Sequence, residues 1–392
     1  MRINTGRLAW ATGTLALLIG CSGTYSAGMD PANSAGAGGA SAGGSPASKA
    51  GSSSTAGAIG DDSSPSGDAG DMSGSSTAGA PSASSLAFCG VAYTDGPAPT
   101  FATPEVVSTR LKEFLTGGKG DSPTLPQVTT RQWAGDLAMS MLGALGNDSA
   151  PGMVSFVSDR LLPGSPIAPT WAAFFSVKGA TLTDLLTTNL VRNPGSGVLT
   201  DTAVLYQAGI QRVSISARGQ YVRKHLLCSE VPPPPPGIPA LPDAMPGQTR
   251  RELLDQSAVS PTCRSCHALM DPIGEALDHF DTVGAYSNVD NGSAIDSTGS
   301  LTLTSGTFTF DGANQLGAKL ADQCEVAQCL AQQMLDHAEA SAALPPAANP
   351  QGRDAADPSK VAPIAAAFSA SKGDLRTLIR EVVQSDTFLR AP

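Results

Sequence analysis

One run of seven residues, Pro261-Thr262-Cys263-Arg264-Ser265-Cys266-His267, constrains the fold of this chain more than any other feature of its sequence. It places two thiols three residues apart and a histidine directly after the second thiol. On one helical turn, this spacing lets each thiol form a thioether with one haem vinyl group, while the imidazole binds the iron. The motif therefore predicts one covalently attached haem c, held by Cys263 and Cys266, with His267 as an axial iron ligand.

Two other chemistries also use closely spaced cysteines. A redox-active C-x-x-C opens a helix after a strand in a thioredoxin-like unit, and the sequence around Cys263 shows no such βαβ pattern. A zinc site needs about four ligands, commonly with a second cysteine pair, and Cys324 and Cys329 have the wrong spacing for that pair. A redox or disulfide-bonded thiol pair and a zinc site stay as alternatives to haem.

The residues around the motif form a longer pattern. Downstream lie Asp271-Pro272, Gly274, Leu277, Phe280-Asp281 and Gly284, and upstream lie Arg218-Gly219, Cys228 and the proline run Pro232–Pro236. This pattern resembles the planctomycete-type cytochrome c proteins, whose C-terminal domains of unknown function carry a C-x-x-C-H-x-x-x-D-P-x-G run. The resemblance covers most of residues 100–392 and is strongest over 216–284. It implies a haem protein with redox activity and supplies no substrate.

The chain departs from this family at one segment. Where the family has Tyr-Ala-x-Gly-Arg, this sequence has His337-Ala338-Glu339-Ala340-Ser341. Any role of that run in the family is therefore not carried over to this chain.

Asp271 has two interpretations. With Pro272 it predicts an N-cap and a first-turn proline, which would start a new helix over Ile273–Phe280 directly after the haem turn. Alternatively, its carboxylate accepts a hydrogen bond from the His267 ring and raises the basicity of that ligand. We expect the capping role.

The N-terminus predicts export and lipidation. Arg2 and Arg7 precede the short apolar stretch Leu8–Ile19, which is too short to span a bilayer as a mature helix. Leu18-Ile19-Gly20-Cys21 then resembles a lipobox, in which Cys21 receives the lipid after cleavage of residues 1–20. An acylated Cys21 gives a stable membrane anchor. Ser22 in place of Asp favours the outer membrane, and both a periplasmic and a surface-facing orientation stay open.

Composition divides the rest of the chain. Residues 21–85 hold the lipidated cysteine and a disordered Ser/Ala/Gly-rich tether, which has too little apolar surface to fold. A helical subdomain over 86–231, a polyproline spacer over 232–240 and a haem-binding subdomain over 241–392 follow. The expected fold is mainly α with a small β-hairpin, in which the second subdomain is mono-haem and c-type cytochrome-like.

Apolar periodicity and capping residues predict the individual elements. The first helix has its N-cap at Thr103 and stops at Gly117-Gly118. The alternation around Thr304-Ser305-Gly306 predicts the hairpin, formed by Leu301–Leu303 and Thr307–Phe310. The other expected helices are Thr130–Leu145, Met153–Leu162, Leu182–Val191, Arg218–Leu227, Gln248–Gln256, Glu325–Ala338 and Asp374–Leu389.

The sixth iron ligand and the disulfides are less determined. Met334 is the candidate sixth ligand, although its apolar helix position also fits core packing, and we expect His279 and His337 at the surface. The four cysteines outside the motif suggest two disulfides in an exported protein. We expect the pairs Cys324–Cys329 and Cys89–Cys228 among the three possible pairings.

These features favour electron transfer over catalysis. The formal net charge is −10 and no long basic run occurs, so nucleic acid is not an expected partner. No phosphate-binding glycine loop or G-x-S-x-G motif occurs, so no catalytic residue is assigned. The expected partners are a redox protein and the membrane, and the oligomeric state is open. The alternatives are a peroxidase- or oxidase-like haem enzyme, a redox subunit of a degradative complex, and a scaffold protein with a structural haem.

Overall fold

The structure is a computed structural model that describes residues 86–94, 100–118, 130–144, 150–162, 181–187, 197–207, 213–234, 236–237, 241–342, 344 and 353–391. The predicted signal peptide, Cys21 and the whole predicted tether lie outside these residues. Helices joined to small two-stranded hairpins make up the architecture, which confirms the predicted fold class. Within the described part of the chain, no helix is both long and apolar enough to cross a lipid bilayer.

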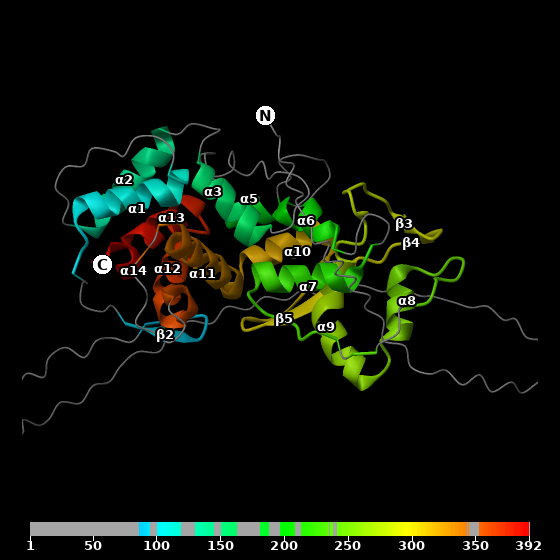
Figure 1. The fold of residues 1–392 in the computed structure, drawn as a ribbon. Helices are drawn as coiled ribbons and strands as arrows, with labels where there is room; N and C mark the ends of the chain where they lie inside the picture. Colours follow the sequence, from blue (N-terminus) through cyan, green and yellow to red (C-terminus); the bar gives the residue numbers. More distant parts are fainter. Residues whose placement is uncertain are drawn as a thin grey trace, which may run out of the picture. The chain divides into compact units, whose positions relative to one another are not determined.

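The elements follow one another along the chain as drawn in Figure 1. The helices are α1 (Pro104–Thr116), α2 (Arg131–Ala144), α3 (Pro151–Phe156), α5 (Leu182–Thr187), α6 (Thr202–Leu205), α7 (Ile215–Leu226), α8 (Arg250–Ser257), α9 (Pro261–Glu275), α10 (Gly312–Ala321), α11 (Cys324–Ser341), α12 (Pro358–Ala370), α13 (Leu375–Gln384) and α14 (Asp386–Leu389). Three irregular helical turns add Val157–Leu161, Gly197–Thr200 and Asp354–Ala356. The antiparallel hairpins are β1 (Leu86–Phe88) with β2 (Val91–Tyr93), β3 (Val289–Asp290) with β4 (Ser293–Ala294), and β5 (Thr298–Leu303) with β6 (Gly306–Asp311).

Local sequence signals fix several of these boundaries. Thr103 is the N-cap of α1, Pro104 is its first helical residue, and Gly117 ends it in the left-handed conformation at φ 60°. The predicted hairpin also forms, with Leu303 opposite Gly306 at its tip. The single helix expected over Asp374–Leu389 is instead two, because Ser385 leaves the helical conformation and caps α14 through the Phe388 amide.

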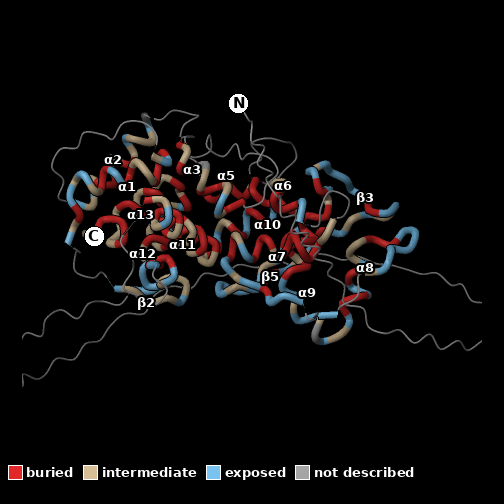
Figure 2. Tube along the Cα trace, viewed as in Figure 1, coloured by how far each residue is buried: buried red, intermediate tan, exposed pale blue. Residues whose placement is uncertain are grey.

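The two ends of the described chain share one core. Helix α2 packs on α13, and the buried guanidinium of Arg110 in α1 donates to the Phe388 carbonyl at 2.6 Å and to the Arg390 carbonyl at 2.9 Å. Figure 1 shows this arrangement as cyan helices beside red ones. Figure 2 shows buried segments continuing through α7, α10 and α11. One cluster of buried side chains draws on residues from both sides of the proline run.

The disulfides correct the predicted pairing. Cys89 bonds Cys324, and Cys228 bonds Cys329, with Cα–Cα distances of 5.5 and 5.3 Å. The predicted Cys324–Cys329 pair is wrong because both residues lie on α11, five positions apart. That spacing separates their Cα atoms by about 7.5 Å along the helix axis and turns the side chains to different faces, beyond the reach of a disulfide. Both bonds instead attach distant segments to α11.

Helix α9, which carries the C-x-x-C-H motif, lies between α7 and β5. A Cβ atom added at Gly219 of α7 would collide with the Met270 carbonyl of α9, and one at Gly274 of α9 would collide with the Ile215 carbonyl of α7. On the other side, Gly299 of β5 leaves room for the Phe310 ring and approaches the Pro272 carbonyl. Gly219 and Gly274 of the sequence pattern, together with Gly299 of β5, thus allow the close packing that holds the motif helix in place.

Candidate functional site

The motif occupies the first turns of α9. Ser260 is the N-cap and accepts a hydrogen bond from the Cys263 amide at 3.2 Å, while Pro261 is the first helical residue. Cys263 and Cys266 follow on the exposed side, where both are partly accessible to solvent. His267 is buried at 4% exposure. The sequence thus places two partly exposed cysteines and one buried imidazole on adjacent turns.

His267 is held by a carboxylate and a hydroxyl. Its Nδ1 lies 2.8 Å from Asp271 Oδ2, and Ser216 Oγ of α7 donates to Asp271 Oδ1 at 2.6 Å. Ser216 Oγ also lies 3.3 Å from His267 Nδ1. With Nδ1 donating its proton to the carboxylate, the lone pair of the ring is on Nε2, which is the nitrogen for a metal ligand.

The structure corrects the expected role of Asp271. Helix α9 runs without interruption through Pro272 to Glu275, so Asp271 lies inside the helix and caps none. An interior proline removes one helical hydrogen bond and costs about 3 kcal/mol. The helix continues because Ile273 and Leu277 are fully buried and because Asp271 binds the His267 ring one turn earlier. The alternative role, a carboxylate partner of His267, is the one observed.

Arg218 secures the chain where α9 ends. Its side chain is 0% exposed, and its guanidinium donates to the Leu277, Phe280 and Asp281 carbonyls at 3.0, 2.7 and 2.9 Å. The same group donates to the Leu205 carbonyl at 3.3 and 3.2 Å. Burial lowers the pKa of Arg218 to about 10, so it stays charged at neutral pH. The Arg-Gly pair of the sequence pattern thus has two structural roles. Arg218 binds the carbonyl groups that follow α9, and Gly219 allows α7 and α9 to pack closely.

The cysteines divide into two groups. Cys89, Cys228, Cys324 and Cys329 are in the two disulfides described above, so none of them completes a zinc site with the motif. Cys89, Cys324 and Glu325 lie close enough to hold a metal ion, but both sulfurs are oxidised. Within the motif, Cys266 is a free thiol and Cys263 is disulfide-bonded. A thioether at Cys263 therefore requires that this disulfide is absent when the cofactor is attached.

The candidate sixth ligand does not lie beside the motif. Met334 is 0% exposed in the core on α11, whereas α9 packs mainly on α7 and β5. His337, expected at the surface, is buried between the Phe114 and Phe156 rings, and its Nε2 lies 2.9 Å from the Gly152 carbonyl. His279 stacks on Tyr286 at 5.0 Å between ring centroids. The structure brings together Cys263, Cys266 and His267, and leaves Met334 in the core.

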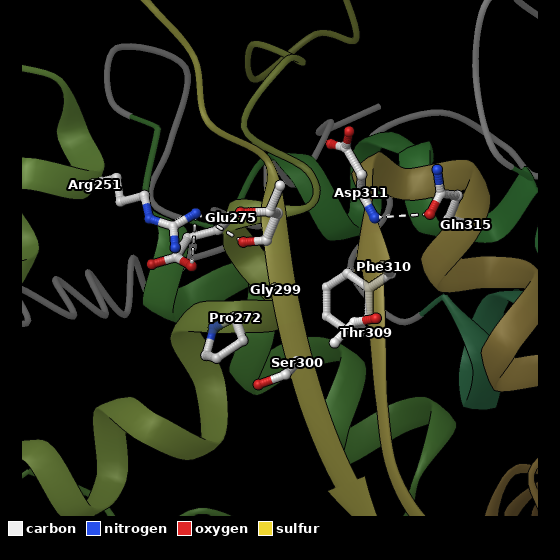
Figure 3. A pocket seen from close by; sticks show the side chains of 10 residues that line it. Arg251, Pro272, Glu275, Gly299, Ser300, Thr309, Phe310, Asp311 and Gln315 are labelled. Carbon is white, nitrogen blue, oxygen red and sulfur yellow. Dashed lines mark hydrogen bonds and ion pairs between the residues drawn. The ribbon is translucent and has the colours of Figure 1, made fainter. Parts of the chain in front are cut away.

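A cavity of about 560 Å³ opens beside the C-terminal part of α9, between this helix and the β5–β6 hairpin. Figure 3 shows Pro272 and Glu275 of α9 facing residues of both strands, with Arg251 of α8 at one end. Glu275 is only 5% exposed, and its Oε2 lies 3.5 Å from the Arg251 guanidinium. Burial raises the pKa of Glu275 to about 7, although Arg251 acts in the opposite direction.

The segment that contains these features matches a known family. Residues 195–290 match PSCyt3, a protein family of unknown function (DUF1588). PSCyt3 is a planctomycete cytochrome c-like domain, which agrees with the resemblance seen in the sequence. The PSCyt3 segment contains α7, α8 and α9, and therefore Ser216, the motif and Glu275. Searches of curated proteins and of solved structures found no match.

Ser216 and Glu275 are two site residues that the motif does not predict. Ser216 had no local signal, because its role depends on the contact between α7 and α9. Glu275 did have a local sequence signal. His267, Asp271 and Glu275 follow one another at intervals of four residues, a spacing that places side chains on one face of a helix. The assumed helix break at Pro272 concealed this regularity.

The donor set of the PSCyt3 segment fits a c-type haem. Two sulfurs at an interval of three residues and an adjacent imidazole lie on one helix, and the imidazole is fixed by its Nδ1 partner. The exposed apolar side chains of Val259 and Leu269, at 51% and 41%, lie on either side of the motif in the sequence. The motif follows helix α8 rather than a strand, which disfavours a thioredoxin-like C-x-x-C.

Proposed function

We propose that this protein is a c-type haem protein that transfers electrons, with one haem attached through Cys263 and Cys266 and bound by His267. The haem supplies a one-electron redox centre when it is attached. The observation that carries the proposal is the buried His267 ring, whose Nδ1 is engaged by Asp271 at 2.8 Å and whose Nε2 lone pair is left for iron. The match of residues 195–290 to a cytochrome c-like domain supports it.

The protein itself supplies two functions in this proposal. Cys263 and Cys266, both partly exposed residues of α9, would hold the haem covalently, and the haem would supply the electron that a partner protein accepts. Asp271 and Ser216 keep the His267 ring in one orientation and one tautomer. No described side chain is assigned to bond making or breaking.

The test is expression with the c-type maturation machinery, followed by spectra of the oxidised and reduced protein and haem staining after denaturing electrophoresis. Wild type is expected to retain haem covalently and to show c-type bands. Cys263→Ala together with Cys266→Ala removes the covalent signal, and His267→Ala changes the spectrum. The matched control is His279→Ala, which removes another imidazole of the PSCyt3 segment. Wild-type protein without bound haem would refute the proposal.

A peroxidase- or oxidase-like haem enzyme is the second candidate function. The place of Met334 favours it, since the expected sixth ligand lies in the core on α11 rather than beside α9. An open iron site would bind carbon monoxide readily in the ferrous state. Rapid carbon monoxide binding would therefore favour the enzyme, whereas an inert ferrous spectrum favours the electron carrier.

We also propose that Cys21 anchors the protein at the outer membrane, with a redox protein as its partner. The support is the sequence Leu18-Ile19-Gly20-Cys21 and the compartment in which c-type haem is attached. Labelling with a radioactive fatty acid is expected for wild type and not for Cys21→Ala. Equal labelling of the two proteins would contradict the anchor.

A further inference from the structure

Glu275 is a buried carboxyl on the same helix face as His267 and Asp271. The three residues follow one another at intervals of four along α9, and all are less than 10% exposed. Asp271 contacts His267 directly, and the charges of Asp271 and Glu275 act on each other. Helix α9 thus carries a row of polar groups from the imidazole to the cavity beside β5 and β6.

The surroundings of Glu275 connect it to solvent. Glu275 lines the cavity of about 560 Å³ shown in Figure 3, whose mouth lies between α9 and the hairpin. Arg251 is fixed beside it, because its Nη1 donates to the Asp296 and Thr298 carbonyls at 3.0 and 2.7 Å. The same guanidinium is shared between Glu275 and Asp296, at 3.5 and 3.3 Å. A proton can therefore reach Glu275 from water while the chain around it stays in place.

Among the described residues, acidic groups around Glu275 outnumber cationic ones. The charged residues that face it are Arg251 and Asp255 of α8, Asp271 of α9, Asp296 before β5, and Asp311 of β6 across the cavity. Further negative charge in this region raises the cost of ionising Glu275. An electron added near His267 is such a charge.

We propose that Glu275 is a proton-binding site coupled to the redox state of the haem held by His267. The inference rests on the proposed function. One electron from a one-electron donor enters the His267 site, and one proton from water binds the Glu275 carboxylate, which becomes a neutral carboxylic acid. Oxidation returns the electron to an acceptor and the proton to water. Glu275 thus reduces the change in local charge that accompanies electron transfer.

Helix geometry gives the size of the coupling. His267 and Glu275 are eight positions apart, which is about 12 Å along the helix axis. At that distance and an effective dielectric constant of about 20, one charge changes proton affinity by about tenfold. The ferric and ferrous proteins should therefore differ by about one unit in the pKa of Glu275. Because reduction favours the proton, the reduction potential falls with rising pH, by about 59 mV in total.

The experiment is a potentiometric titration of the haem absorption of the mature protein from pH 5 to 9. Wild type should lose about 59 mV of potential across neutral pH. Glu275→Gln should lack this step, and the matched control Asp311→Asn, which changes another carboxylate of the same cavity, should keep it. A step of wild-type size in Glu275→Gln, or a flat profile in wild type, would overturn the proposal.

Infrared spectroscopy of the wild-type protein gives an independent measurement. The reduced-minus-oxidised difference spectrum at pH 7 should contain a protonated carboxylic acid band that shifts in heavy water and is missing in Glu275→Gln. The same band in both proteins would assign the proton to another group. A wild-type protein without haem bands would instead refute the proposed function itself, before any titration.

Discussion

Gly219 of α7 and Gly274 of α9 bring two helix backbones into contact at one crossing, each lying against a carbonyl of the other helix. The same crossing places Ser216 of α7 within hydrogen-bond distance of Asp271. Packing and site geometry therefore depend on the same two glycines.

Gly219→Ala is expected to lower the free energy of unfolding by about 1–3 kcal/mol or more, because the added methyl group must displace the Met270 carbonyl. Gly143→Ala is the matched control, since that glycine lies in α2 with open space around it. There, alanine should stabilise the helix by about 0.5–1 kcal/mol. Urea denaturation measures the free energy of unfolding of both variants. Equal stability of Gly219→Ala and wild type would contradict the close contact of α7 with α9 at Gly219.

Arg218→Leu should destabilise the protein by about 3 kcal/mol. The change removes the donor to four buried or partly buried carbonyl groups, from Leu205, Leu277, Phe280 and Asp281. Arg264→Ala, at an exposed position of α9, serves as the control and should stay within about 0.5 kcal/mol of wild type. Urea denaturation measures the free energy of unfolding of both variants. A small effect of Arg218→Leu would show that water replaces the guanidinium at these carbonyl groups.

Much of the helical fold follows from local signals. Thr103, Pro104 and Gly117 define α1, and the alternation around Gly306 defines the hairpin. Helix α12 is not predicted, because Pro363 interrupts its apolar pattern. Val361, Ile364 and Phe368 of this helix are nevertheless buried, so tertiary packing overrides the proline.

The site was predictable only in part. Cys263, Cys266 and His267 are adjacent in sequence, and their helical spacing determines their arrangement without tertiary information. The role of Asp271 was not predictable, because Asp-Pro usually starts a helix and here lies within one. The disulfides depend on which segments meet α11, and no local pattern encodes that choice.

Removal of the Cys228–Cys329 bond by the double variant Cys228→Ser with Cys329→Ser should cost about 4–5 kcal/mol. The bond joins residues 101 positions apart, and a closed loop of that length restricts the unfolded chain strongly. Peptide mapping without reduction should recover Cys89 with Cys324 and Cys228 with Cys329. The free thiol variant Cys266→Ser should leave this map unchanged. A peptide pair joining Cys324 to Cys329 would disprove the observed pairing.

Asp271→Asn should raise the reduction potential of the proposed haem by about 59 mV, a tenfold change in the preference for the ferric state. The carboxylate increases the basicity of His267, which stabilises the ferric form, and the neutral amide does so less. Ser216→Ala keeps the carboxylate and should have a smaller effect in the same direction. Potentiometry on the three proteins measures the series, and an unchanged potential in Asp271→Asn would exclude an electronic role for this carboxylate.

Glu275→Gln should stabilise the protein at alkaline pH and have little effect at acidic pH. In the folded protein the pKa of Glu275 is about 7, against an ordinary value of 4.5, because burial disfavours the ionised form. The folded state therefore binds the proton more tightly than the unfolded state, so wild-type stability falls as pH rises from about 4.5 through 7. The variant has no proton to lose at this position, and its advantage should grow over the same interval to at most about 3 kcal/mol. Urea denaturation of both proteins at pH 5, 6, 7 and 8 measures the difference, and a constant difference at all four values would show that Glu275 is ionised throughout.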